Sequence, residues 1–216
     1  MKSLCILLFC VQFWGCSTVP VTGRKSLSLV PESEVNSLAS NSYDELIKKS
    51  KLADDTEEGE LVRRVGQRIA AVSDQKDFKW EYHLIDEPKT VNAFCMPGGK
   101  VAFYTGIMPV AKTEAGVAVV MGHEVAHAIA RHGSERLSQQ LVIGLGGLTL
   151  AQAVKSKPAE TQKLANMAFG LGVGLGYVLP YGRKQESEAD RIGLIYMARA
   201  GYDPAEAVEF WKRMDA

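Results

Sequence analysis

The chain has 216 residues, of which 46% are hydrophobic, enough for one domain with a sizeable apolar core. Its 25 Lys and Arg residues balance 25 Asp and Glu residues, so nothing in the net charge of zero indicates nucleic acid as a partner. The sequence contains no low-complexity run, internal repeat or clear interdomain linker.

Residues 1–15 have the pattern of a secretory signal. Lys2 precedes a short apolar run that is typical of a signal peptide and too short to cross a bilayer. We therefore predict a signal peptide over residues 1–15, a tether over residues 16–30 and one folded domain over residues 31–216.

The end of this segment is similar to a bacterial lipoprotein signal. In such signals a small residue precedes the cysteine that becomes the acylated N-terminus, as Gly15 precedes Cys16 here. Phe13 and Trp14 depart from the usual pattern, so ordinary cleavage nearby and an uncleaved anchor stay open as alternatives. Lipidation of Cys16 would anchor the protein at the periplasmic face of a bacterial membrane, and by analogy Ser17 favours the outer membrane.

Two helices and a small sheet are predicted in the first half of the chain. Apolar residues recur at helical spacing in residues 31–49 and 58–73, so both segments should be packing helices. Residues 78–84 alternate between apolar and polar side chains, which indicates a strand. Residues 91–105 should form a hairpin around a turn with two glycines. The predicted fold class is therefore α+β and predominantly helical.

The motif His-Glu-Val-Ala-His over residues 123–127 indicates a metal site. It lies in a helix predicted over residues 113–133. His123 and His127 are four residues apart and share one face of that helix, so both imidazoles can bind one metal ion. Glu124 can take a proton from the attacking water, which is the role of the general base in zinc hydrolysis. Histidines satisfied by hydrogen bonds inside a core are the alternative.

A catalytic zinc site needs a third protein ligand and leaves the fourth position for water. Glu186 and Asp190 are four residues apart in a later predicted helix, so they share a face. We predict Glu186 as the third ligand and Asp190 as the residue that holds the ring N–H of a ligand histidine. Glu188 lies about 200° further round the helix and is expected to face solvent. A solvated acidic first turn is the alternative for all three.

Other residues near the motif have less definite roles. His132 follows His127 by five residues, so it is rotated by about 140° and should line the cleft or cap the helix end. Cys95 is expected to be a small buried apolar residue rather than a nucleophile. For oxyanion support four candidates stay open, which are His132, Tyr177, Tyr181 and Arg183.

Two apolar, glycine-rich segments separate the two halves of the predicted site. Residues 135–154 and 164–179 should both be helical, and neither reaches the length of uninterrupted apolar sequence that a membrane span needs. We predict that they pack closely as a hairpin in the core. Membrane insertion and a lid over the site stay open as alternatives.

Three segments together resemble a family of zinc metallopeptidases. They are residues 91–106, residues 122–133 with the His-Glu-x-x-His motif, and residues 183–193 with the Glu-x-x-x-Asp spacing. The family includes the CAAX prenyl proteases, the bacterial HtpX heat-shock proteases and the mitochondrial inner-membrane quality-control proteases. Residues 20–30 are typical of its bacterial lipoprotein-type branch.

The resemblance implies a zincin-like metallopeptidase fold with one Zn²⁺ ion per chain and Glu186 as the third ligand. It also implies hydrolysis of peptide bonds in misfolded or misassembled proteins of the cell envelope. In zinc peptidases of the broader thermolysin-like group, an edge strand before the metal helix binds the substrate backbone. Asn92, Ala93 and Phe94 are the candidates for that strand, and its partner around residues 101–103 is the alternative.

A chaperone-like or assembly factor that keeps the metallopeptidase fold with little turnover is the alternative function. Glu124 separates the two functions, because hydrolysis needs a general base and binding alone does not. A purely structural zinc site is disfavoured, since three protein ligands leave a position open and structural sites close it with a fourth ligand.

Overall fold

The computed structural model describes residues 16–73 and 75–215, so the predicted signal peptide lies outside the described residues. The elements of the first half are β1 (Cys16–Thr18), β2 (Lys25–Leu27), α2 (Glu32–Lys49), α3 (Glu57–Ala71), β3 (Glu81–Ile85), β4 (Ala93–Met96), β5 (Lys100–Tyr104) and η2 (Thr105–Ile107). Those of the second half are α4 (Met108–Ala111), α5 (Glu114–Ile129), α6 (His132–Val154), α7 (Ala159–Val173), η3 (Gly174–Val178), α8 (Leu179–Arg199) and α9 (Glu206–Met214). The α+β, predominantly helical class predicted from the sequence is confirmed.

A three-stranded sheet precedes the motif helix, as predicted. β5 is the central strand and pairs in parallel with β3 and antiparallel with β4. β4 is therefore an edge strand, with no second strand partner among the described residues. β3 begins at Glu81, later than predicted, because Phe78 and Trp80 pack as aromatic side chains beside the turn at Gly99 instead of joining the sheet.

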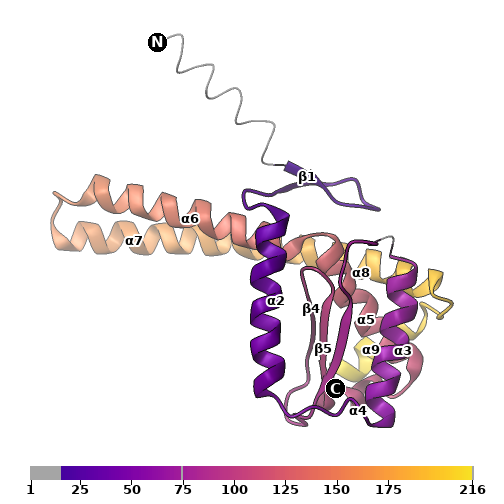
Figure 1. The fold of residues 1–216 in the computed structure, drawn as a ribbon. Helices are drawn as coiled ribbons and strands as arrows, with labels where there is room; N and C mark the ends of the chain where they lie inside the picture. Colours follow the sequence, from indigo (N-terminus) through magenta and orange to yellow (C-terminus); the bar gives the residue numbers. More distant parts are fainter. Residues whose placement is uncertain (1–15, 74, 216) are drawn as a thin grey trace.

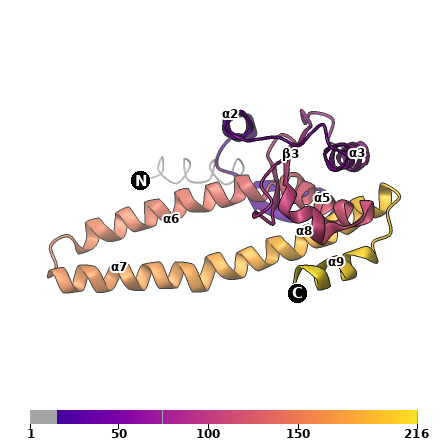
Figure 2. The same ribbon diagram turned by 90° about the horizontal axis from the view of Figure 1, so that it is seen from below.

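The central helix is α5, which lies between the sheet and α8 and also contacts α3 and α9 (Figures 1 and 2). Thr113 caps its N-terminus, since Thr113 Oγ1 accepts a hydrogen bond of 2.9 Å from the Gly116 N–H. The helix ends at Ile129 because Arg131 takes a left-handed backbone conformation, with φ of 60°, before α6 begins. The predicted helix over residues 113–133 is therefore too long at its C-terminal end.

Two glycines set the distance between α5 and α8. A Cβ added at Gly193 would lie 2.8 Å from the backbone of Gly122 and of His123, and a Cβ at Gly122 would lie 2.8 Å from the Gly193 carbonyl oxygen. The two backbones thus touch directly beside the His-Glu-Val-Ala-His motif. This contact brings α8, with its acidic residues, to the face of α5 that carries the two histidines.

We expect Gly193→Ala to destabilise the fold by about 1–3 kcal/mol, because the added methyl group must push α5 and α8 apart. The same displacement moves Glu186 away from the histidines and should weaken metal binding. Urea unfolding and zinc titration measure the two effects. Gly182→Ala is the matched control in α8, since a Cβ there meets nothing within 4 Å. Equal effects of the two substitutions would contradict this explanation of the helix contact.

The apolar helices α6 and α7 do not form a core hairpin, so that prediction is wrong. They run side by side away from the rest of the domain, as Figures 1 and 2 show from two directions. No residue from 140 to 184 is buried, and Leu145 and Leu171 are 64% and 57% exposed. By length and composition, α6 and the continuous helical segment Ala159–Arg199 could each cross a membrane.

Candidate metal centre

Three potential ligand atoms converge where α5 meets α8. The Nε2 atoms of His123 and His127 are 3.1 Å apart, because the two side chains lie one turn apart on the same face of α5. Glu186 Oε2, from α8, is 3.4 Å from the first and 3.5 Å from the second nitrogen. Ligand atoms of a tetrahedral zinc ion with bonds of about 2.0–2.1 Å lie about 3.3 Å apart. The three atoms therefore have the spacing of ligands to one metal ion.

Asp190 fixes the orientation of the first imidazole. Its Oδ1 atom is 2.9 Å from His123 Nδ1, from the position one turn beyond Glu186 on α8. A carboxylate only accepts hydrogen bonds, so the His123 Nδ1 atom carries the proton. The Nε2 atom of His123 consequently presents a lone pair to the convergence point.

A second carboxylate fixes the other imidazole through an intervening histidine. Glu188 Oε2 is 3.0 Å from His132 Nε2, and His132 Nδ1 is 2.9 Å from His127 Nδ1. Since the carboxylate accepts, His132 donates from Nε2 and accepts at Nδ1 from the His127 Nδ1–H. Burial lowers the pKa of His127 to about 3 and also lowers the pKa of His132, which keeps both imidazoles neutral. The His127 Nε2 atom therefore also presents a lone pair.

This arrangement corrects two predictions from the sequence. Glu188 is only 9% exposed rather than facing solvent, and His132 is fully buried rather than lining the cleft or capping a helix end. Helical spacing gave the angle of Glu188 on α8 correctly, but it could not reveal that the β1–β2 hairpin and the start of α6 cover that side. The two residues are thus part of the site that sequence reasoning missed.

The electrostatics of the convergence point favour a cation. Two imidazole nitrogens and one carboxylate oxygen face one another within 3.5 Å, and in the neutral tautomers that Asp190 and His132 favour the inward nitrogens present lone pairs. Histidines satisfied inside a core would instead turn these nitrogens toward donors. Two neutral imidazoles and one carboxylate are a ligand set that suits zinc, so the residues present fit a bound metal ion.

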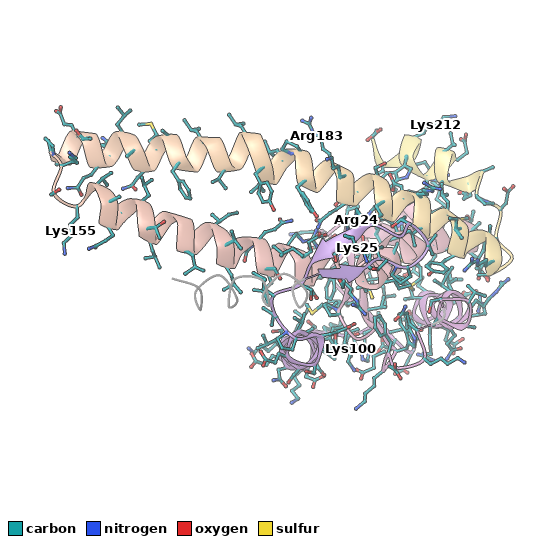
Figure 3. The ribbon with its side chains drawn as sticks, turned by 90° about the horizontal axis from the view of Figure 1, so that it is seen from above. Arg24, Lys25, Lys100, Lys155, Arg183 and Lys212 are labelled. Atoms are coloured by element: carbon teal, nitrogen blue, oxygen red, sulfur yellow. The ribbon has the colours of Figure 1, made fainter. Side chains whose placement is uncertain are left out.

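Arg24, which directly precedes β2 and is labelled in Figure 3, forms hydrogen bonds with acidic residues of α6 and α8. Its Nε atom donates to Glu188 Oε2 at 2.8 Å, and its Nη1 atom donates to Glu135 Oε1 at 2.9 Å. Burial raises the pKa of Glu188, but hydrogen bonds from Thr22, His132 and Arg24 outweigh burial and leave that pKa lowered. The segment over residues 16–30, predicted as a tether, thus supplies one arginine to two nearly buried carboxylates.

We expect Arg24→Met to destabilise the fold by about 3 kcal/mol, because it leaves the carboxylates of Glu135 and Glu188 without their cation. The side chains of these two residues are 0% and 8% exposed, whereas that of Arg24 is 30% exposed, which favours the lower end of the usual range. Thermal and urea unfolding measure the loss. The exposed neighbour Lys25→Met is the control and should be nearly neutral. An equally stable Arg24→Met protein would contradict the assigned role.

Glu124 lies beside the ligand atoms in a cleft of about 430 Å³ between α5 and the sheet edge. The pKa of Glu124 is raised to about 7, mainly by burial; His123 opposes the rise and the nearby Glu186 contributes to it. The cleft is lined by the three ligand side chains, by residues 92–97 around β4, and by Arg136. A carboxyl group with this pKa can both accept and return a proton near neutral pH.

The two candidate substrate strands differ in their place in the sheet. Ala93 and Phe94 lie in the edge strand β4, Asn92 directly precedes them, and all three line the cleft. The alternative around residues 101–103 lies in β5, which is paired on both sides and has no free edge. Only β4 can therefore accept another strand beside the ligand atoms.

None of the four residues considered for oxyanion support lines this cleft. Tyr181 hydrogen bonds to Glu135, and Arg183 lines a different hollow next to Arg24. The cationic side chain of the cleft is Arg136, from the second turn of α6. Its position depends on the sharp turn at Arg131, which the sequence pattern did not indicate.

The sequence of this chain is similar to parts of several known proteases. The mitochondrial metalloendopeptidase OMA1 of Schizosaccharomyces pombe is 41% identical over 155 residues, which cover 72% of this chain and 43% of that protein. The human metalloendopeptidase OMA1 is 27% identical over 226 residues, which cover 100% of this chain and 43% of that protein. The beta-barrel assembly-enhancing protease of Escherichia coli is 26% identical over 162 residues, which cover 72% of this chain and 32% of that protein.

The chain thus spans less than half the length of these three relatives. The model of peptidase family M48 matches residues 56–215, which include the histidine motif on α5 and the acidic residues on α8. Because this match covers most of the chain and both halves of the candidate metal centre, the chain belongs to peptidase family M48.

Proposed function

We propose that this protein is a zinc-dependent endopeptidase in which His123, His127 and Glu186 hold one Zn²⁺ ion. The observation that carries the proposal is the convergence of two inward lone pairs and one carboxylate oxygen within 3.5 Å, next to Glu124 in an open cleft. Three ligands leave one coordination position for water or substrate, as catalytic rather than structural zinc sites do. When bound, zinc polarises the scissile carbonyl group and acidifies water.

The chain's own residues supply the remaining chemistry. Glu124 takes the proton of the attacking water and then gives it to the leaving amine. The edge strand β4 holds the substrate backbone extended across the cleft through main-chain hydrogen bonds. Arg136 provides positive charge for the carbonyl oxygen as negative charge develops there. Asp190, His132 and Glu188 keep the two imidazoles in the tautomers that face the ion.

The proposed substrates are misfolded or misassembled polypeptides of the bacterial cell envelope. Recognition of the backbone by an edge strand depends little on side chains, which suits substrates of varied sequence. The name of the Escherichia coli relative refers to assembly of beta-barrel proteins, which supports an envelope role. A lipid anchor on Cys16 at the periplasmic face, with the outer membrane favoured, stays a prediction because residues 1–15 lie outside the described part of the chain.

Removal and return of zinc test this proposal. We expect the purified protein to cleave casein, to lose the activity when a chelator strips the metal, and to regain it when one equivalent of Zn²⁺ is added. Circular dichroism before and after stripping is the control for unfolding. Cleavage that persists in fully metal-free protein would contradict the proposal.

A further inference from the structure

An uncharged band covers α6 on one side of the hairpin and, on the other side, the segment from α7 through η3 to the start of α8. Residues 140–154 and residues 164–182 contain no Asp, Glu, Lys or Arg, and none of them is buried. At a rise of 1.5 Å per residue, the two stretches are about 22 and 28 Å long. The two helices run antiparallel and side by side (Figures 1 and 2), so the uncharged stretches lie next to each other. These lengths suit the hydrocarbon core of a bilayer, which is about 30 Å thick, because local thinning of the bilayer and long basic side chains at the ends accommodate a shorter stretch.

The band is apolar on its outer side as well as between the helices. Leu145, Leu148 and Leu164 are 64%, 69% and 65% exposed. Phe169 contacts the other helix at Gly146 and Gly147, so the inner side is apolar too. A helix at a protein surface or in a soluble helical dimer keeps one polar face toward water, whereas in residues 141–151 and 167–180 only Thr149 and Tyr177 have polar side-chain atoms. An apolar surface on all sides is the property of a helix surrounded by lipid.

Glycines give a second, independent indication. A Cβ at Gly144, Gly170, Gly172, Gly174 or Gly176 would meet nothing within 4 Å, so close packing within the chain does not require these glycines. In a water-exposed helix each glycine costs about 1 kcal/mol relative to alanine. Glycine is more frequent in membrane helices, where the lipid environment stabilises the helical backbone and a small side chain permits close helix contact.

Basic residues mark both ends of the band. Lys155, Lys157 and Lys163 surround the tip, and Arg183 and Lys184 lie at the base; Figure 3 labels Lys155 and Arg183 at these opposite ends. Long basic side chains at the two ends of an apolar helix reach the headgroup layers on either side of a bilayer. A soluble protein can contain such a helix as a buried core helix or as a signal sequence near its N-terminus. Neither explains α6, because α6 lies in the middle of the chain and only 11% of its most apolar stretch is buried.

We propose that α6 and α7 insert into a phospholipid bilayer as a helical hairpin, with the lysines of the tip at the far headgroups and Arg183 and Lys184 at the near headgroups. Glu186 follows Arg183 by three residues on α8, a rise of about 4.5 Å. The metal centre would then lie about one helical turn from the near membrane surface. Its substrates would be polypeptide segments that emerge from the same bilayer, a consequence that rests on the proposed peptidase function, whereas the insertion does not.

Site-specific fluorescence tests the insertion without any need for activity. The full chain carries Cys5→Ser, Cys10→Ser, Cys16→Ser and Cys95→Ala, of which Cys16→Ser also removes the predicted lipid anchor, and one new cysteine labelled with the fluorophore NBD. Leu148→Cys reports the middle of the band, Lys157→Cys reports the tip, and Ser37→Cys on α2 is the exposed control. Vesicles of phosphatidylcholine with a minority of phosphatidylglycerol are the probe, and circular dichroism checks that each labelled protein is folded.

We expect NBD at position 148 to shift to the blue and brighten several-fold when the protein is reconstituted in vesicles, while NBD at position 37 does not change. In vesicles that bear the folded domain outside, external dithionite should spare NBD at position 157. Three results would overturn the proposal: an unchanged spectrum at position 148, a blue shift that depends on protein concentration without lipid, or rapid reduction at position 157. The last result would place the hairpin on one membrane surface.

A separate experiment tests the substrate class. Leu145→Glu combined with Leu171→Glu places two charges in the band, and Leu29→Glu combined with Leu38→Glu is the exposed control pair. With a peptide substrate anchored in the vesicles, loss of insertion should lower cleavage at least about tenfold, because the enzyme and substrate no longer share one surface. Cleavage of soluble casein should be unchanged. If the wild-type protein cleaves neither substrate, the peptidase function fails, yet the fluorescence result stands by itself.

Discussion

Glu124→Gln is expected to abolish proteolysis while the protein keeps its metal. Glu124 lines the cleft beside His123 and His127 without being one of the three convergent atoms, so the amide removes the general base and leaves the ligands in place. Loss of a general base lowers kcat by a factor on the order of 10²–10⁴. Casein cleavage measures the activity, and the zinc content of the same preparation measures the metal.

The matched control for this substitution is Glu58→Gln, at an exposed position on α3. It should cleave casein at the wild-type rate. A Glu124→Gln protein that retains full activity would rule out the assigned base. A folded, zinc-loaded wild-type protein that cleaves nothing would instead favour a chaperone-like or assembly factor with the metallopeptidase fold.

Glu186→Ala is expected to lose the metal. Glu186 supplies the only carboxylate oxygen among the three convergent atoms, and two neutral imidazoles alone leave a divalent cation without charge compensation. The Glu186 side chain is 55% exposed, so its removal should change the stability of the metal-free protein little. The zinc content after dialysis should fall well below one ion per chain, and casein cleavage should fall with it.

Thermal unfolding separates this effect from misfolding. Zinc that binds only the folded state raises the Tm of the wild-type protein, and it should not raise the Tm of Glu186→Ala. Ser187→Ala, the exposed neighbour on α8, is the control and should respond to zinc as the wild type does. If Glu186→Ala keeps one tightly bound zinc ion, the third ligand must be a different residue.

The parts of the site that depend on spacing along one helix could be predicted from the sequence. A separation of four residues places His123 with His127, and Glu186 with Asp190, on one helix face in both the prediction and the structure. The contact between the two helices depends on Gly122 and Gly193, whose importance no single-helix pattern indicates. Local periodicity therefore gave the ligand pairs, and the resemblance to known peptidases paired them across about sixty residues of chain.

The parts of the site and of the fold that depend on contacts between distant segments of the chain could not be predicted from the sequence. Glu188 and His132 are buried because Arg24, from the connection between β1 and β2, pairs with the acidic residues of two helices. The apolar helices α6 and α7 have the composition of a core element, and the sequence alone does not show that the domain's core is complete without them. In both cases the deciding factor is what lies against a helix face, which is a property of the whole fold.

The most direct test of the metal centre is anomalous X-ray diffraction at the zinc absorption edge on crystals of the purified, active protein. We predict one peak per chain, within bonding distance of His123 Nε2, His127 Nε2 and Glu186 Oε2. Crystals of a preparation that cleaves casein but show no peak between these three atoms, or show the peak at another site, would contradict the proposed centre.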